Sequence, residues 1–375
     1  MSARFLLRPN ESLPIEVSPK DAAPRQFHQR LPGYAPTPLI DAPEIAEMFG
    51  VGQILLKNES SRFGLPAFKI LGASWAVYRA LDQRLGHSLG EWQTLAELVE
   101  LLAPVRPLTL ATATDGNHGR AVARMAKLLG FAANIYMPRG TAQARINGIA
   151  SEGAQVEIVD GTYDDAVERA AQDAGERCLV ISDTSWPGYE EVPRWVMEGY
   201  STIMFEIDEE LARRGESAPD LIAVQFGVGA LAAAVVRHFR GSKILSVEPL
   251  SAACMLTAME AGEIVSVPGP HDSIMAGLNC GRVSIVAWPI VSRGMDVFIA
   301  IEDERAREAM RALARVGIIA GETGGSGVAG VIELLTGDRS AEYRAALNID
   351  QNTRVLAFIT EGATDPEAYA RIVCA

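Results

Sequence analysis

Two hydrophobic patterns alternate along most of this 375-residue chain. One is a short continuous apolar run, and the other is a series of apolar residues three or four positions apart. Short apolar runs, such as Gln53–Asn58 and Leu221–Phe226, predict buried strands. Spacings of three and four, as in Leu71, Trp75 and Tyr78, predict amphipathic helices. Strands that alternate with helices are typical of parallel sheets covered on both faces, so the sequence predicts an α/β fold.

The other expected elements follow from the same patterns. Strands are predicted at Leu108–Thr114, Ala132–Met137, Gln155–Val159, Cys178–Ser182, Lys243–Glu248, Val297–Ile301 and Val355–Thr360. Helices are predicted at Ala42–Phe49, Ser88–Leu102, Arg120–Leu129, Ala142–Glu152, Tyr163–Ala174, Glu191–Glu210 (in one or two pieces), Ala230–Phe239, Glu302–Val316 and Gly327–Leu335. The rest of residues 1–50 is expected to be an extended lead-in. Boundaries near 85 and 190 predict a large domain of residues 1–84 and 190–375 around a small domain of residues 85–189.

Composition and charge argue against several classes of protein. The chain is 48% hydrophobic and 22% charged, with a net charge of −13. A nucleic-acid partner is not expected, because neutralising phosphates needs a basic surface. No apolar run is long enough to span a membrane, and the first ten residues lack a signal-peptide pattern. The four cysteines form no CxxC pair, so we expect a cytoplasmic protein without a metal site.

Lys69 is the only lysine in the mostly apolar segment from Ser61 to Ser74. The helical pattern that follows places it near the first turn of a helix. Partial burial and the positive end of the helix dipole would both lower its pKa. A lysine with a lowered pKa is a nucleophile suited to forming a Schiff base. The alternative is an exposed lysine whose aliphatic stem covers apolar neighbours.

Two loops join a predicted strand to a predicted helix and could bind an anion with backbone N–H groups. The first is Thr112–Gly119, in which Asp115 and Asn117 are also ordinary turn and N-cap residues and His118 is expected to be structural. The second consists of Gly227, Val228, Gly229, Ala230 and Leu231. Its glycines let a bound group approach the backbone closely.

The second loop also satisfies the dinucleotide-binding fingerprint, and Glu248 follows at the spacing of a ribose-binding acid. An NAD-dependent oxidoreductase therefore stays open at this point. Asp183 follows another predicted strand, and Thr360 ends the last one. Ligands of open α/β sheets bind beyond the carboxyl ends of the strands, where all these residues are expected.

In combination, these segments resemble the diaminopropionate ammonia-lyases, within the fold type II (tryptophan-synthase-β-like) pyridoxal-phosphate enzymes. The resemblance runs from about residue 50 almost to the C-terminus, and its segments are Arg62–Lys69, Ala113–Arg120, Asp183–Glu190, Gly227–Ala230, Met275–Cys280 and Thr360–Pro366. The lysine and the Asp-Gly-Asn-His-Gly loop are specific together. The sequence departs from the family pattern at Pro66, Ala73, Phe226 and Ala363.

The resemblance implies a role for each matched residue. Lys69 would hold pyridoxal 5′-phosphate covalently, and Asn117 would hydrogen-bond its 3′ oxygen. The backbone of Gly227, Val228, Gly229, Ala230 and Leu231 would cradle the phosphate, and Thr360 would face the pyridine nitrogen. The substrate carboxylate would bind at Thr114, Gly116 and Asn117. The resemblance also implies a homodimer and places Cys254 and Cys280 close enough to pair under oxidation.

Asp115 departs from the wider superfamily, whose serine and threonine dehydratases generally have a small hydroxyl residue there. A carboxylate opposite Lys69 could act as a second base for a D-substrate, while Lys69 serves the L-isomer. Asp115 and Asp183 together suit a substrate with a second ammonium group. The expected reaction, one of amino-acid catabolism, is α,β-elimination of ammonia from 2,3-diaminopropionate, which gives pyruvate and two ammonia.

Three alternatives remain open: a serine- or threonine-type dehydratase, an NAD-dependent oxidoreductase, and a pyridoxal-phosphate-binding protein without turnover. Cofactor storage would need neither Asp115 nor Asp183.

Overall fold

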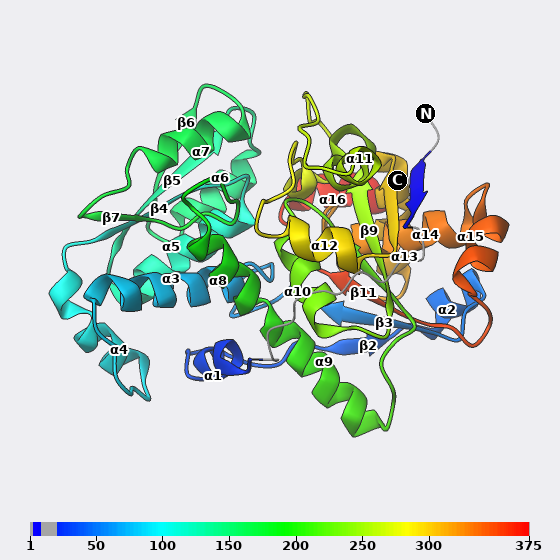
Figure 1. Ribbon diagram of the computed structural model, residues 1–375, viewed down its shortest axis with the longest axis horizontal. Helices are drawn as coiled ribbons and strands as arrows, with labels where there is room; N and C mark the ends of the chain where they lie inside the picture. The colour runs from blue at the N-terminus through cyan, green and yellow to red at the C-terminus, as the bar shows by residue number, and fades with distance from the viewer. Residues whose placement is uncertain (1–2, 9–20, 375) are drawn as a thin grey trace. The chain divides into compact units, whose positions relative to one another are not determined.

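The computed structural model describes residues 3–8 and 21–374, so residues 1–2 and 9–20 of the predicted lead-in lie outside that part. The described chain forms two compact units. The first draws on the ranges Met1–Lys20, Pro36–Ser61 and Ile203–Ala375, and the second on Asp21–Ala35 and Arg62–Thr202. Figure 1 labels their helices and strands.

The first unit is built on a seven-stranded sheet whose five inner strands run parallel. The two edge strands are antiparallel to their neighbours. In spatial order the strands are β1 (Arg4–Leu7), β10 (Val297–Ile301), β9 (Lys243–Pro249), β8 (Leu221–Gln225), β11 (Arg354–Ile359), β3 (Gln53–Asn58) and β2 (Leu39–Asp41).

Helices cover both faces of this sheet, which explains why its inner strands are almost wholly apolar. Leu221 and Ala223 of β8 share a core with Val328 and Val331 of α14, while the intervening Ile222, which points to the other face, is equally buried. The helices are α2 (Pro43–Phe49), α9 (Ser201–Arg214), α10 (Ala230–His238), α11 (Cys254–Ala261), α12 (Trp288–Gly294), α13 (Asp303–Arg315), α14 (Ser326–Thr336), α15 (Ser340–Leu347) and α16 (Pro366–Val373).

The second unit has a parallel four-stranded sheet in the order β6 (Gln155–Val159), β5 (Ala132–Pro138), β4 (Thr109–Ala113) and β7 (Cys178–Val180). Its helices are α1 (Ala23–Gln29), α3 (Ile70–Leu85), α4 (Leu95–Leu101), α5 (Asn117–Leu129), α6 (Gln143–Ala150), α7 (Tyr163–Ala171) and α8 (Glu191–Gly199). The prediction of an α/β fold with two mainly parallel sheets is confirmed.

The strands β4 to β7 fall within residues 85–189, and all other strands fall outside. The compact units nevertheless place α1, α3 and α8 with the four-stranded sheet, because these helices pack on one another and α3 packs on α5. The limits of domains that fold or move as units therefore stay a prediction.

Two local predictions were wrong. Within Ser88–Leu102 only α4 is helical, because Trp92 is buried beneath the guanidinium of Arg30 and the hydroxyl of Thr94 caps the helix by accepting the N–H of Glu97 at 3.3 Å. The described part of residues 1–50 is not an extended lead-in, since it contains β1, α1, β2 and α2.

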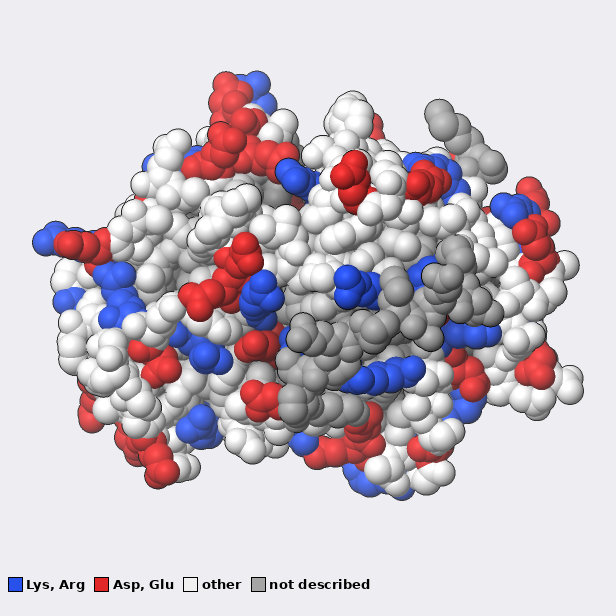
Figure 2. All heavy atoms as spheres, viewed as in Figure 1, with Lys and Arg blue, Asp and Glu red and all other residues white. Residues whose placement is uncertain are grey.

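The surface carries both signs of charge. On the face in Figure 2, Lys and Arg side chains are interspersed with Asp and Glu, so the net charge of −13 is not gathered in one region of that face. Among the described residues, no helix has the length and apolar character that crossing a bilayer requires.

Candidate active site

Lys69 immediately precedes α3, as the sequence predicts. Its side chain is 24% exposed, and Nζ lies 2.7 Å from Oδ2 of Asp183. The expected lowering of the Lys69 pKa is wrong. Burial is the largest cause and lowers this pKa, but Asp183, Tyr200 and Asp115 together outweigh it, and the pKa lies well above its ordinary value. Lys69 is therefore an ammonium held by a carboxylate.

Asp183 lies in the loop that follows β7, three residues beyond the strand. Tyr189 fixes this loop, because its hydroxyl accepts the N–H of Ser182 at 2.9 Å and donates to the carbonyl of Val180 at 2.7 Å. Burial raises the pKa of Asp183, but Lys69 and His118 together outweigh it, and the pKa lies well below its usual range. Asp183 is thus a buried carboxylate that stays ionised.

The loop after β4 leads directly into α5. The hydroxyl of Thr114 accepts the N–H groups of Gly116 at 2.9 Å and Gly119 at 3.1 Å, which ties the loop to the first turn of the helix. Asn117 is the first residue of α5. Burial raises the pKa of Asp115, while Arg145 and Lys69 lower it and Asp183 raises it further. Asp115 therefore belongs to the same charged cluster as Lys69.

His118 is also part of this cluster, although the sequence favoured a purely structural role. Its Nε2 lies 2.7 Å from the carbonyl oxygen of Ile181, and its Nδ1 lies 3.9 Å from Oδ2 of Asp183. Burial lowers the pKa of His118, Asp183 raises it and Lys69 lowers it, and the pKa lies below its ordinary value.

Sequence reasoning missed Tyr200, which follows α8 and is fully buried. Its ring lies 4.7 Å from the ring of Phe68, and a Cβ on Gly72 would come within 2.6 Å of it. Burial raises the pKa of Tyr200, although Lys69 acts to lower it. A lone tyrosine at a helix end gives no chemical signal, so only the fold places it beside Lys69.

Glycines also set the distance between α3 and α8. A Cβ on Gly199 of α8 would lie 2.8 Å from Cα of Gly72 and would also meet the carbonyl oxygen of Leu71. The two helices are therefore in backbone contact at the turn that follows Lys69.

The first unit holds the predicted phosphate loop. Gly227, Val228 and Gly229 connect β8 to α10, which begins at Ala230 and continues through Leu231. Gly229 has a φ of +103°, and a Cβ there would lie 2.7 Å from the buried ring of Phe226. The loop is therefore compact, and the first-turn amides of α10 can serve an anion.

Thr360 directly follows β11 and is buried. Its hydroxyl oxygen accepts a hydrogen bond of 2.9 Å from Nε2 of Gln225, which also donates to the carbonyl of Phe358 at 3.1 Å. Gln225 ends β8, so one amide links the carboxyl ends of two neighbouring strands and orients the Thr360 hydroxyl.

Two cysteines lie against Gly227 of the phosphate loop, and Glu248 contacts one of them. Sγ of Cys254 lies 3.4 Å from the carbonyl oxygen of Gly227, and a Cβ on Gly227 would lie 3.4 Å from Sγ of Cys280. Neither cysteine forms a disulfide bond. The Glu248 carboxylate accepts the N–H groups of Met255 and Leu256 at 2.6 and 2.9 Å. Burial raises its pKa to about 7. This buried acid caps α11 and cannot bind a ribose, which removes the main support for the NAD alternative.

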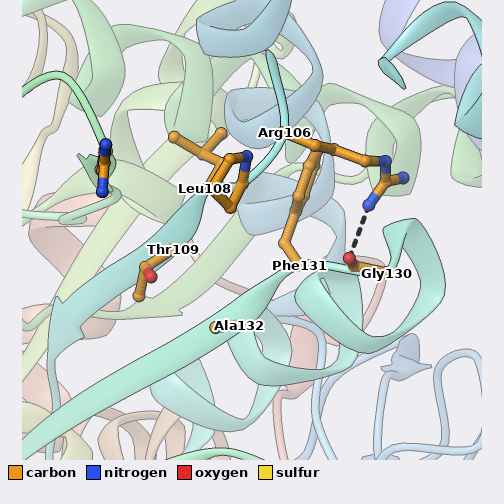
Figure 3. A pocket seen from close by; sticks show the side chains of 8 residues that line it. Arg106, Leu108, Thr109, Gly130, Phe131 and Ala132 are labelled. Carbon is orange, nitrogen blue, oxygen red and sulfur yellow. Dashed lines mark hydrogen bonds between the residues drawn. The ribbon is translucent and has the colours of Figure 1, made fainter. Parts of the chain in front are cut away.

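A hollow of about 350 Å³ in the second unit lies at the other end of the four-stranded sheet (Figure 3). Thr109 and Ala132, which begin β4 and β5, line it together with Arg106. Arg106 donates to the carbonyl of Gly130 at 2.6 Å, and its guanidinium lies over the ring of Phe131. Arg106 is thus occupied in holding the end of α5. Since ligands bind at the carboxyl ends, this hollow is not the site.

The predicted site residues therefore form two groups. Lys69, Thr114, Asp115, Gly116, Asn117 and Asp183 belong to the second unit, whereas Gly227, Val228, Gly229, Ala230, Leu231 and Thr360 belong to the first. Among the described residues, no group of three or more His, Cys, Asp or Glu side chains could hold a metal ion.

A family model described as "Pyridoxal-phosphate dependent enzyme" matches residues 30–361 of the chain. The chain belongs to this family. Among its pyridoxal-phosphate dependent relatives, the diaminopropionate ammonia-lyase of Salmonella typhimurium is 38% identical over 365 residues, which cover 92% of this chain and 90% of the relative. An L-threonine dehydratase of Mycobacterium leprae is 26% identical, and the match covers 96% of this chain and 75% of the dehydratase.

The solved structures agree with the family. The crystal structure of diaminopropionate ammonia-lyase from Escherichia coli in complex with D-serine matches with a TM-score of 0.91 at 34% identity. The match covers 99% of this chain and 97% of that one. The predicted fold type II architecture of pyridoxal-phosphate enzymes is thereby confirmed, and pyridoxal phosphate is the family's cofactor.

Proposed function

We propose that this chain is an ammonia-lyase that eliminates ammonia from 2,3-diaminopropionate with pyridoxal 5′-phosphate. With one water consumed, the products are pyruvate and two ammonia. The observation that carries the proposal is the pair of carboxylates, Asp115 and Asp183, in one buried cluster with Lys69. A substrate with two ammonium groups needs such a cluster, and the similar enzymes of Salmonella typhimurium and Escherichia coli are named for this substrate.

The residues of the chain fit the cofactor. Lys69 supplies an amine for its aldehyde, and the loop at Gly227 and Gly229 supplies backbone amides and space that a Cβ would fill. Thr360 supplies a neutral hydroxyl for the pyridine nitrogen, and Asn117 supplies an amide for the 3′ oxygen. When bound, pyridoxal phosphate is an electron sink for the pair left after an α-proton is removed.

The side chains of the second unit then perform the proton transfers. Lys69 takes the α-proton of the L-isomer, and Asp115 takes that of the D-isomer. Because burial raises the pKa of Asp115, its carboxylate is a stronger base than an exposed one. Asp183 stays ionised and holds a cation, either Lys69 or an ammonium group of the substrate. Thr114, Gly116 and Asn117 bind the substrate carboxylate at the start of α5.

The dehydratase alternative receives less support. A β-hydroxy substrate brings no second ammonium, so only Arg145 and Lys69 would compensate the Asp115 carboxylate. The threonine dehydratase from Mycobacterium leprae is also the more distant relative, at 26% identity. A binding protein without turnover would need neither carboxylate.

The first experiment replaces Lys69 by alanine and measures pyruvate formation from each enantiomer of diaminopropionate. Lys127→Ala is the matched control, because Lys127 is an exposed lysine in the last turn of α5 in the same unit. Borohydride reduction followed by peptide mapping should label Lys69 in the wild type and in the control, and nothing in Lys69→Ala. A label on another lysine, or preferred turnover of serine, would overturn the proposal.

The family resemblance also supports a cytoplasmic homodimer that acts in amino-acid catabolism. Light scattering on the purified chain tests the oligomer, with a mass near 40 kDa as the contrary result. Cell fractionation tests the location.

A further inference from the structure

His118 offers a buried nitrogen that the proposed reaction does not use. The residue is 3% exposed, and its Nε2 lies 2.7 Å from the carbonyl oxygen of Ile181. A carbonyl only accepts, so Nε2 carries a hydrogen. In neutral imidazole Nδ1 then carries none. Nδ1 is buried and has no hydrogen-bond partner among the described residues.

This bare nitrogen points at a carboxylate oxygen. Nδ1 lies 3.9 Å from Oδ2 of Asp183, the same atom that lies 2.7 Å from Nζ of Lys69. A lone pair and a carboxylate do not attract each other, but a protonated Nδ1 would be attracted to Asp183. The charged groups that face His118 are Asp183 after β7, Asp115 after β4 and Lys69 before α3.

We propose that His118 is the alternate cation of Asp183, which takes up a proton at Nδ1 whenever Lys69 gives up its positive charge. The inference rests on the proposed function, in which Lys69 acts as a nucleophile and a base and so cannot stay an ammonium. One proton is lost at Nζ of Lys69 and one is gained at Nδ1 of His118, so the cluster keeps its charge. His118 is thus a positioning residue that acts through Asp183.

Electrostatics agree with this arrangement. Burial and the ammonium of Lys69 both oppose a charge on His118, whereas Asp183 and Asp115 favour it. When Lys69 loses its charge, one of the causes that lower the His118 pKa is removed. Asp183 then has no ammonium partner and acts on His118 only. A buried carboxylate that loses its partner is strongly disfavoured, so a second cation within reach is retained.

The test is a nitrogen NMR titration of the histidine rings in the full-length chain. Cofactor-free wild type is compared with Lys69→Met, which has a neutral side chain of similar length, and with Lys127→Met as the control. The five histidines are resolved by specific labelling, and His118→Gln assigns the signal. Ring nitrogen shifts distinguish the Nε2–H tautomer from the doubly protonated ring.

Wild type and Lys127→Met should show the Nε2–H tautomer near neutral pH. In Lys69→Met the midpoint should move up by about one pH unit or more, which is about tenfold in proton affinity. An unchanged midpoint in Lys69→Met, or a hydrogen on Nδ1 of the neutral ring, would overturn the inference. The titration involves no turnover, so its failure leaves the proposed function standing, and loss of diaminopropionate activity alone leaves the inference standing.

Kinetic measurements distinguish a positioning role of His118 from a purely structural one. His118→Gln should lower kcat by about tenfold or more and flatten its pH profile, with little change in KM or Tm. A drop in Tm with an unchanged pH profile would assign His118 a structural role.

Discussion

Nζ of Lys69 lies 2.7 Å from Oδ2 of Asp183, and this ion pair governs when the lysine can react. An ammonium is not a nucleophile, and Asp183 raises the Lys69 pKa well above its ordinary value. The amine therefore becomes available only when another group satisfies Asp183, such as a substrate ammonium or a protonated histidine.

Replacing Asp183 by asparagine should lower the Lys69 pKa, because burial is the largest cause and only Tyr200 and Asp115 would still oppose it. Cofactor attachment should then extend to lower pH, since the amine is deprotonated over a wider range. Visible absorbance after adding pyridoxal phosphate to cofactor-free protein measures attachment. Asp173→Asn is the control, because Asp173 pairs with Arg169 instead. An unchanged pH dependence in Asp183→Asn would contradict this role.

Asp115→Asn tests the two-base hypothesis. The variant should keep the cofactor but lose about 10²–10⁴-fold in rate on D-2,3-diaminopropionate, the usual effect of removing a base. The L-isomer should lose less, because Lys69 remains. In the wild type, D-isomer turnover should fall on the acidic side as Asp115 becomes protonated, at a pH above that of an exposed aspartate. Equal losses on both enantiomers would make Asp115 a binding residue only.

Two substitutions of Gly229 distinguish the effect of backbone strain from the effect of charge in the phosphate loop. Gly229→Ala adds a Cβ at a φ of +103° beside the ring of Phe226, which should weaken cofactor binding. Gly229→Asp adds the same Cβ and a negative charge. If the loop binds phosphate, the aspartate variant should bind pyridoxal phosphate more weakly than the alanine variant, with no such excess for pyridoxal without phosphate. Equal binding by both variants would place the phosphate elsewhere.

Glu248 should make the stability of the chain depend on pH. Burial raises its pKa from 4.5 to about 7 in the folded chain. As pH rises, the unfolded chain therefore loses this proton at a lower pH than the folded chain does. The contribution of Glu248 to the free energy of unfolding is fully present below pH 4.5. As pH rises to about 7, the free energy of unfolding falls by about 3 kcal/mol. Glu248→Gln lacks this loss, so its stability relative to wild type should increase between pH 4.5 and 7. Urea unfolding at pH 4.5, 6 and 8 measures the difference, and a constant difference would contradict the expectation.

Cys254 and Cys280 both lie at Gly227 and should pair under oxidation. Burial raises the pKa of Cys254, so the reaction should be slow at neutral pH and faster in alkali. Peptide mapping without reductant after mild oxidation detects the bond, and Cys178→Ser, which changes a cysteine of the other unit, should not affect it. Free thiols at both positions after oxidation would rule the pairing out.

Local patterns were enough to predict much of this molecule. The apolar period after Lys69 predicted α3, and each strand-to-helix loop predicted a site at a carboxyl end. The sign of the Lys69 pKa shift could not be predicted, because its partner Asp183 is 114 residues away in sequence. Tyr200 was missed for the same reason. The edge strand β1 was missed because its partner β10 is far away in the sequence, and β2 was missed because it has only three residues.

The contact between Gly72 and Gly199 has a consequence for motion. With no side chains between them, α3 and α8 cannot move closer at this point without a collision of main-chain atoms. Larger side chains at Gly72 or Gly199 would push the helices apart one turn from Lys69. The place of the Lys69 main chain in its unit therefore depends on two residues that have no side chain.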